Sequence, residues 1–375
     1  MSTQRAPSDF ARCVSPAFPD RPRDREMHMQ VIRVDPRTHP LWCQLVHRVQ
    51  SNIFHSPAWI QVLTDTYGWE ANAYVIVDDR GEPCAGIPFC RIADMMGERI
   101  VVLPFSDYCD PLTDNKCGWE VLIEQLLSER NPVIVRCLHN SLPLSDKRFS
   151  VAKQAKWHGL DLRPGLDELW HQMQDSTHRA IRKSQREDVQ IRVAQSEREL
   201  REFFEMHLKI RKYKYGLLAQ PFLFFQKIWR HFVESQQGFL LLAVLGDKIL
   251  AGDFFLQWKD TLYYKFNAST PEDLSHRPND LLIWEAIQRG KNQGLQFLDF
   301  GLSDVDQEGL IRYKRKFGTE EKTISFLRHD PNGGPSSAEK EMRALLGRLT
   351  KQFTDQSVPD LVTERAGEDL YRLFT

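Results

Sequence analysis

Charged and polar side chains gather at one end of a short apolar segment, within residues 294–318. The alternation over 297–300 predicts a half-buried strand that ends at Gly301. An acidic loop, 303–306, follows this strand, and a basic segment, 312–316, comes next. A charged rim at a strand end is where a mixed α/β sheet tends to bind a ligand. The alternative for this stretch alone is a surface loop with a solvated charge run.

The composition is typical of a globular protein with a full core. The chain has 375 residues, of which 41% are hydrophobic and 27% charged, which allows two domains of ordinary size or one large domain. The net charge is −1, so no overall field favours a nucleic-acid or membrane partner. Any surface of that kind must be a local patch.

The cysteines and the apolar runs further limit the kinds of protein that this sequence can encode. The seven cysteines form no Cys-x-x-Cys pair and have no histidine at ligand spacing, so neither a metal site nor a disulfide framework is indicated. Scattered thiols fit a reducing, cytoplasmic protein. No apolar run is long enough to span a membrane. The first 28 residues lack an apolar core of the secretory type, and we expect a disordered leader over residues 1–29.

Elements that would position the charged stretch can be predicted along the chain. Ser56 and Pro57 are a strong helix start, and Gly68 a helix end. The expected helices are 41–49, 57–67, 119–127, 166–186, 200–211, 221–233, 281–291 (capped by Asn279-Asp280) and a short one near 310, with an amphipathic helix in the tail. The expected strands are 30–35, 73–77, 84–89, 100–103, 133–135, 239–245 (opened by Gly238), 248–258, 261–267, 297–300 and 323–327, of which the three over 239–267 form an antiparallel meander.

Two segments echo each other in this order of elements. Residues 84–89 and 250–255 each follow a strand and a glycine-containing turn, and each contains Ala-Gly. Such an echo favours two copies of one α/β fold over two unrelated domains. We therefore expect an N-terminal domain over 30–165, a C-terminal domain over 166–330, and a linker with a helix over 331–375.

Helices, then an antiparallel meander, then helix–strand–helix–strand is the order of the Gcn5-related N-acetyltransferase (GNAT) fold. Two tandem copies resemble the FemAB family of peptidoglycan interpeptide-bridge aminoacyltransferases and the wider BioF2-like acetyltransferase group. The similarity covers roughly residues 50–330 and rests on the order and spacing of several motifs. In the first copy these are FHSPAW from Phe54 and LPF from Leu103, followed by Asp107-Tyr108 and Asp110-Pro111. In the second copy they are HRAIRK from His178, His207 with Arg211 and Tyr215-Gly216, Ala251-Gly252, Tyr264, LDFG from Leu298, and Tyr313-Lys314 with Phe317-Gly318.

The resemblance implies a reaction and a set of site residues. An amine attacks an activated acyl group directly, and a fixed cation stabilises the tetrahedral oxyanion. Lys314 matches the family's lysine before the terminal Phe-Gly, and Asp107 lies in the loop by the acceptor site, where a carboxylate can orient the amine or take its proton. The other implied substrate-binding residues are Arg211, Tyr215, Tyr108, Asp110, Tyr264, Asp299 and Ser303. Each has a plain structural alternative: a surface lysine, a helix-end arginine, an Asp turn before proline, or core tyrosines.

Two departures from the family's sequence pattern bear on the identity of the acyl donor. A CoA-binding member carries a glycine-rich turn whose amides hold the pyrophosphate. Residues 267–273 have no glycine and two acids here, which argues against ordinary acetyl-CoA chemistry in the second domain. The coiled-coil arm that some bridge-forming enzymes use for tRNA is also missing, because residues 166–186 are too short for it.

We therefore predict a cytoplasmic acyl- or aminoacyltransferase acting on an amine of a cell-envelope precursor or polysaccharide sugar. No permanently bound cofactor or metal is expected, and the co-substrate is acyl-CoA or aminoacyl-tRNA. The expected partners are a small-molecule or lipid-linked amine acceptor and charged tRNA, with peripheral proximity to a membrane. The alternatives are a CoA-dependent N-acyltransferase of another small molecule and a non-catalytic binding protein. The basic run 178–192 has interrupting acids and no interleaved aromatics, which is typical of a solvated helix face rather than a nucleic-acid site.

Overall fold

The computed structural model describes residues 30–375, so the expectation for the leader 1–29 lies outside the described residues. Twelve strands form one mixed sheet in the order β1-β2-β3-β4-β5-β12-β6-β11-β10-β9-β8-β7. The first unit contains β1 (Gln30–Val34), α1 (Pro40–Arg48), η1 (Ile53–His55), α2 (Pro57–Tyr67), β2 (Glu70–Val77), β3 (Pro83–Asp94), β4 (Gly97–Val101), α3 (Lys116–Leu127), β5 (Val133–Cys137), α4 (Leu142–Ser145) and β6 (Ser150–Asp161).

The second unit repeats this order of elements. It contains α5 (Leu166–Gln172), α6 (Asp175–Arg186), β7 (Gln190–Val193), α7 (Glu197–Lys209), the π-helix η2 (Ile210–Lys214), α8 (Phe222–Ile228), the π-helix η3 (Trp229–Val233), β8 (Gly238–Leu245), β9 (Lys248–Trp258), β10 (Thr261–Ser269), η4 (Pro271–His276), α9 (Pro278–Asn292), β11 (Phe297–Asp304), α10 (Glu308–Arg315) and β12 (Glu320–His329). From β7 onward the order is that of the first unit. A strand and two helices come first, three strands follow, and then a helix, a strand, a helix and a strand complete the unit. The predicted fold class is confirmed.

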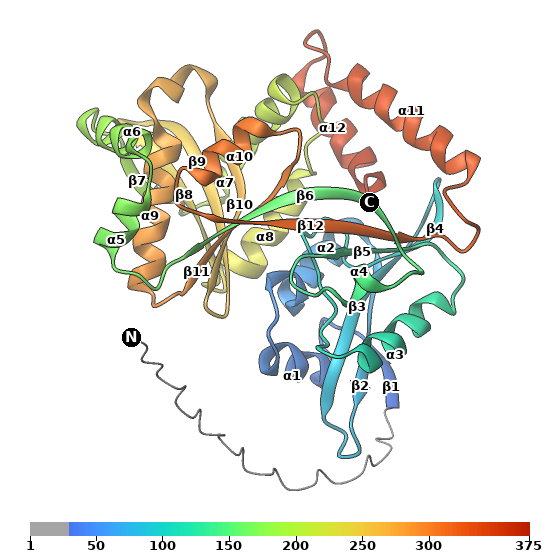
Figure 1. The fold of residues 1–375 in the computed structure, drawn as a ribbon. Helices are drawn as coiled ribbons and strands as arrows, with labels where there is room; N and C mark the ends of the chain where they lie inside the picture. The colour runs from blue at the N-terminus through green and yellow to red at the C-terminus, as the bar shows by residue number, and fades with distance from the viewer. Residues whose placement is uncertain (1–29) are drawn as a thin grey trace, which may run out of the picture.

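The two units exchange their last strands. Strand β6, which ends the first unit, pairs antiparallel with β11 of the second, as in Leu160 opposite Leu298. Strand β12, which ends the second unit, pairs with β5 of the first, as in Leu327 opposite Val135. Strands β6 and β12 also pair with each other and run side by side across the middle of the molecule (Figure 1). The sheet is therefore continuous between the units; the predicted domain boundary after residue 165 stays a prediction.

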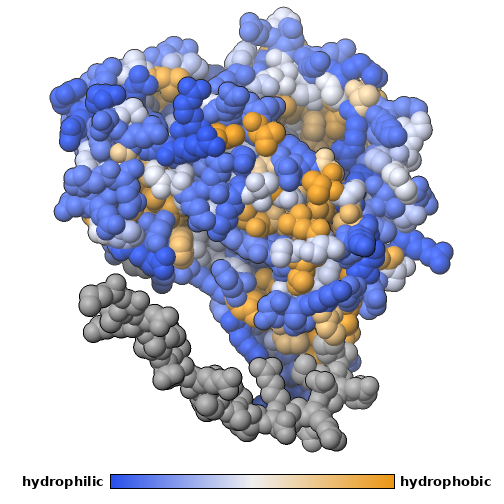
Figure 2. Space-filling model, in the orientation of Figure 1, coloured by the Kyte–Doolittle hydropathy of each residue, from blue (hydrophilic) through white to orange (hydrophobic). Residues whose placement is uncertain are grey.

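The hydrophobic cores do not follow the division into two units. The larger cluster is shared, because it joins Trp59 and Phe54 of the first unit to Phe224 and Phe225 of the second. A smaller cluster lies between the second half of the sheet and α9, around Phe255. Figure 2 shows hydrophobic residues gathered near the centre of one face, within a largely hydrophilic surface. Burial shared across the units stabilises their association at roughly 25 cal/mol per Å² of apolar area removed from water.

Local signals fixed several elements as predicted. Ser56 caps α2, since its hydroxyl accepts a hydrogen bond from the Trp59 amide, and Gly68 ends that helix at φ 70°. The meander β8–β9–β10 begins at the predicted Gly238 and turns through Gly246 and Lys259, which both have positive φ. These elements follow from short-range sequence alone.

Other predictions were wrong. The expected helix 166–186 is two helices, because Met173 and Gln174 are extended; Met173 is buried and the Gln174 amide donates to the Lys316 carbonyl at 2.9 Å. Strand β11 does not end at Gly301 but continues through Asp304, so Ser303 belongs to the strand. Helix α9 begins at Pro278 after Arg277, with no side-chain cap from Asn279-Asp280. Strands β6 and β7 were not predicted.

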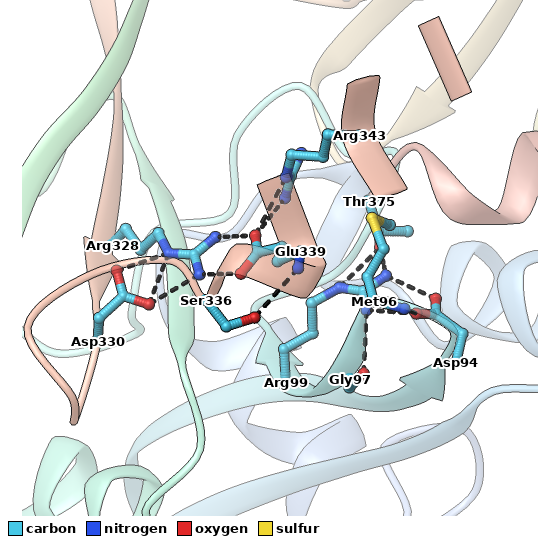
Figure 3. Close-up of polar contacts among 10 residues, drawn as sticks. All are labelled: Asp94, Met96, Gly97, Arg99, Arg328, Asp330, Ser336, Glu339, Arg343 and Thr375. Atoms are coloured by element: carbon cyan, nitrogen blue, oxygen red, sulfur yellow. Dashed lines mark hydrogen bonds and ion pairs between the residues drawn. The ribbon is translucent and has the colours of Figure 1, made fainter. Parts of the chain in front are cut away.

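The tail folds back onto both units through α11 (Ser337–Phe353), α12 (Asp360–Leu370) and η5 (Tyr371–Leu373). In Figure 3, Glu339 of α11 lies between Arg328 of β12 and Arg343, and its contacts to Arg328 are two hydrogen bonds of 2.7 Å. Arg99 of β4 joins Asp94 and the Thr375 hydroxyl in the same view. Among residues 30–375, no helix is both long and apolar enough to cross a membrane.

Lys212 of η2 makes buried contacts with the start of α12 and the residues before it. Its ammonium is fully buried and contacts the Val358 carbonyl and the Asp360 carboxylate, the latter at 2.9 Å. The Tyr213 hydroxyl donates to the same carboxylate at 2.7 Å. Gly367 packs so closely on the Ala219 carbonyl that a Cβ would lie 2.5 Å from it. The tail thus holds the π-helical end of α7 and the loop after it.

Replacing Asp360 with Asn should therefore destabilise the protein. The buried Lys212 ammonium would lose its charged partner, which we expect to lower the free energy of unfolding by about 2 kcal/mol. Urea unfolding measures this. The control is Glu202→Gln, which breaks a pair with Arg198 whose side chain is 85% exposed, and should change the free energy by less than about 0.5 kcal/mol. Equal effects of the two substitutions would contradict the anchoring role of Lys212.

Candidate active site

Strands β10 and β11 diverge in the middle of the second unit. They pair in parallel only over Thr261–Phe297, Leu262–Leu298 and Tyr263–Asp299. Beyond that point β10 has an irregularity between Tyr264 and Phe266, and β11 has one between Asp299 and Leu302. The carboxyl end of diverging parallel strands is where α/β sheets bind ligands, because side chains and backbone groups there lack neighbouring strands.

The equivalent opening in the first unit is occupied by its own chain. The loop after β4 runs along β5, where the Cys109 amide donates to the Arg136 carbonyl at 2.9 Å. The Asp110 carboxylate accepts hydrogen bonds from the amides of residues 138–140. Burial raises the pKa of Asp110, and these amides oppose that effect. The contacts of Asp110 are those of a turn, which is the structural alternative given above, and the first unit leaves no comparable opening.

The same loop carries Asp107 across to the second unit. Its carboxylate accepts a hydrogen bond of 2.9 Å from the ammonium of Lys265 on β10. The Lys265 side chain is 5% exposed and its ammonium lies 4.6 Å from the centre of the Phe54 ring. Gly301 has φ 65°, and a Cβ there would lie 2.5 Å from the Asp107 carboxylate. Asp107 is thus held between a lysine and the turn in β11.

Sequence reasoning missed Lys265. The available signal was a lysine inside the apolar strand sequence Leu-Tyr-Tyr-Lys-Phe, where a cation needs a buried partner. That partner comes from the other unit, 158 residues away along the chain, so no local pattern indicates it.

Lys314 of α10 approaches the same turn. It is 2% exposed, and its ammonium donates to the carbonyls of Gly301 at 3.0 Å and Leu302 at 2.9 Å. A lysine has three N–H donors, so one remains. Burial lowers the pKa of Lys314 to about 7; the charges of Asp107 and Asp299 oppose this shift and that of Lys265 adds to it. Lys314 therefore changes charge near neutral pH.

Asp299 and Tyr108 complete the cluster. The Tyr108 hydroxyl donates to one Asp299 oxygen at 2.7 Å, and the Gly301 amide donates to the other at 2.6 Å. Burial raises the pKa of Asp299 and of Tyr108. The Asp299 carboxylate fixes the turn at Gly301, and that turn presents the carbonyl that binds Lys314. Asp107, Tyr108, Asp299 and Lys314 were predicted from the sequence, and the structure brings these four together.

The remaining predicted residues lie around this cluster or apart from it. The Arg211 guanidinium donates twice to the Leu218 carbonyl, at 3.0 and 2.9 Å, as a helix-end residue does. Tyr215 is exposed just after η2. Tyr264 is buried between Phe255 and Phe300. Ser303 is fully buried, and its hydroxyl has no partner within the described part of the chain.

Two surface hollows among residues 30–375 lie near the cluster or apart from it, and neither includes Lys314 or Asp299. One of about 530 Å³ lies between Val151–Gln154 of β6 and residues 304–306, just beyond the Lys314-bound turn. Another, of about 370 Å³, lies between the tail and β4, away from the cluster. Because Lys314 and Asp299 are both buried, a substrate must displace side chains to reach them.

Comparisons with known proteins place this geometry in a class. Residues 172–315 match the family described as the acetyltransferase (GNAT) domain. The chain is similar in structure to FemX, with a TM-score of 0.60 and 14% identity over 79% of this chain and 96% of that one. It is also similar to L-PGS from Bacillus licheniformis, with a TM-score of 0.53 and 14% identity over 86% and 99%. None of the curated proteins compared matches the sequence.

A tandem GNAT protein from the clavulanic acid biosynthesis pathway is similar as well, with a TM-score of 0.50 and 10% identity over 83% of this chain and 100% of that one. At these identities the similarity concerns the fold. The protein is an acyltransferase with two GNAT folds in tandem. Residues 172–315 of its second unit match the GNAT acetyltransferase domain, and the overall fold is similar to that of FemX.

Gly301 is the tightest point of the cluster, and Gly301→Ala should show this. The new Cβ would lie 2.5 Å from the Asp107 carboxylate, and the backbone at this position would keep the alanine at φ 65°. We expect the free energy of unfolding in urea to fall by about 2 kcal/mol, of which the left-handed backbone accounts for roughly half. Gly309→Ala in α10 is the control, because its Cβ would enter open space. A Gly301→Ala protein as stable as the control would contradict the close packing of Asp107.

Proposed function

We propose that this protein transfers an activated acyl or aminoacyl group to an amine of a cell-envelope precursor or polysaccharide sugar. The observation that carries the proposal is the buried Lys314 ammonium, with two N–H groups bound to backbone carbonyls and one left for a ligand. A preorganised cation in a water-poor site stabilises a developing oxyanion without reorganisation. The fold shared with FemX and with the C-terminal domain of a putative lysylphosphatidylglycerol synthetase from Agrobacterium fabrum supports a cell-envelope substrate.

The reaction needs few protein groups. The amine nitrogen attacks the acyl carbon, and the carbonyl oxygen gains negative charge, which the third N–H of Lys314 stabilises. Asp107 orients the attacking amine and accepts its proton, since its carboxylate is held beside Gly301 by Lys265. The bond from the acyl carbon to the donor oxygen or sulfur then breaks, and the leaving group takes up the proton. No covalent enzyme intermediate is required.

The identity of the acyl donor is a separate part of the proposal. GNAT folds use acyl-CoA as a co-substrate, and the described part of this chain has no glycine-rich turn after β10. The corresponding segment carries Asp273 and Asp280, paired with Lys248 and Lys316. Backbone amides at this helix start would have to bind a pyrophosphate next to these acids. We therefore treat acyl-CoA and aminoacyl-tRNA as alternatives that an experiment decides.

The first test is transfer from acyl-CoA and from aminoacyl-tRNA, side by side, to amino sugars and peptidoglycan precursors. With Lys314→Ala, kcat should fall by roughly 10²–10³-fold while acceptor affinity stays nearly unchanged. Arg315→Ala is the matched control, because Arg315 is exposed on the same helix turn and pairs only with Glu321 among the described residues. Loss of acceptor affinity alone would assign Lys314 to binding. Transfer from neither donor by the folded protein would overturn the proposal and favour a binding protein.

The pH dependence tests the charge that Lys314 carries. Its pKa is lowered to about 7, so the cationic fraction decreases as pH rises through 7. If the cation stabilises the oxyanion, kcat should fall by about tenfold for each pH unit above that pKa. Lys314→Arg, which keeps its charge, should give a flat profile over the same range. A kcat that instead rises through pH 7 in the native protein would make Lys314 a general base.

A further inference from the structure

Asp253 of β9 is a buried acid that the proposed transfer does not use. Its side chain is fully buried, immediately after Gly252. One carboxylate oxygen accepts a hydrogen bond from the Asn267 side-chain amide, and the other has no partner among residues 30–375. Burial raises the pKa of Asp253 to about 8, which the bond from Asn267 opposes. An acid buried with an unpaired oxygen is costly to keep unless it binds something.

Polar groups of three elements, β10, α9 and α10, lie near Asp253. Asn267 of β10 also donates to the Asn279 side chain of α9 at 3.3 Å, and the Tyr313 hydroxyl of α10 donates to the Asn279 carbonyl at 3.0 Å. The charge of Asp253 contributes to the raised pKa values of Tyr264 and Tyr313, after burial in each case, so both phenols lie within electrostatic range. Asn267, Asn279 and Tyr313 are partly buried, whereas Asp253 is fully buried, so a ligand must displace side chains to reach its free oxygen.

The other acids at this end of α9 already have cations. Asp273 binds Lys248 at 2.6 Å, and Asp280 binds Lys316. Asp253 makes no ion pair with any residue of the described chain. When ionised, its carboxylate is therefore the uncompensated charge of this region. The region suits a cation better than the anion that helix starts commonly bind.

We propose that Asp253, together with Asn267, Asn279, Tyr264 and Tyr313, binds a primary ammonium group of a substrate. The free Asp253 oxygen accepts an N–H of the ammonium, and the two tyrosine rings add cation–π attraction. Tyr313 precedes Lys314 in α10, so the same helix carries a residue of each site. The inference rests on the proposed transfer reaction. The ammonium belongs either to the aminoacyl group being transferred or to a second amine of the acceptor.

Binding an ammonium ion should release a proton from Asp253. At pH 7 the free carboxyl is mostly protonated, because its pKa lies near 8, and the bound cation favours its ionised form. Three of the other facing groups do not titrate near pH 7. Burial raises the pKa of Tyr264 and Tyr313 well above the usual value, and the pKa of His207 behind Asn267 is lowered to about 4. Burial also raises the pKa of Asp280, and its pairing with Lys316 opposes that effect.

The test is calorimetric titration of the full-length protein at pH 7 in two buffers of different ionisation enthalpy. The probes are alaninamide for a donor-type amine and glucosamine for an acceptor-type amine, each with its N-acetylated counterpart. One of the two amines should bind, with release of close to one proton, and its acetylated counterpart should not. Which amine binds assigns the ammonium to donor or acceptor.

Asp253→Asn should weaken binding of that amine by at least about tenfold and abolish the proton release, because the amide cannot ionise. Asp273→Asn is the matched control and should bind like the native protein, since Asp273 is already paired with Lys248. Unchanged affinity in Asp253→Asn, or proton release that persists in it, would overturn the proposal. If that variant fails to fold, absence of proton release in the native protein does the same.

These outcomes separate from those of the transfer assay. Native protein that transfers an acyl group but binds neither amine would leave the proposed function standing and remove the ammonium site. Amine binding with Asp253-dependent proton release, but without transfer from either donor, would keep the site and remove the reaction.

Discussion

The exchange of β6 and β12 between the two units is the constraint on which the candidate site depends. Each terminal strand pairs with a strand of the other unit, so neither unit can complete its sheet alone. The exchange fixes the loop of the first unit that carries Asp107 against the turn at Gly301. The shared hydrophobic core then excludes water from their junction. A site made of residues from both units needs this degree of rigidity.

Burial at that junction is what gives its charged groups their chemistry. Lys265 and Lys314 lie near Asp107 and Asp299 in a place with little water, so desolvation and pairing act on each group in opposite directions. For Lys314 desolvation prevails, because its ammonium contacts two carbonyl dipoles and no carboxylate directly. A lysine with a pKa near neutrality changes charge at low free-energy cost, whereas an exposed lysine would remain a fixed cation.

The parts of this fold that the sequence predicted are those specified locally. Ser56, Gly68 and the meander from Gly238 follow from caps, turns and alternation. Strand β6 escaped prediction because its first half, Ser-Val-Ala-Lys-Gln, is polar and exposed, and pairing with β12 and β11 rather than burial keeps it extended. The pairing of Lys265 with Asp107 could not be predicted from the sequence either, because it also depends on contacts between the two units. Lys314 and Asp299 were predicted through family resemblance, not through periodicity.

The two units have the same order of elements but different roles, and the difference lies in what fills each strand opening. In the first unit the loop after β4 binds along β5, and Asp110 locks it through three backbone amides. That loop can no longer admit a ligand there, but it presents Asp107 to the second unit. In the second unit, Lys314 and Asp299 lie buried where β10 and β11 diverge. The loop that fills the first unit therefore brings Asp107 to the second, so the candidate site draws on both units.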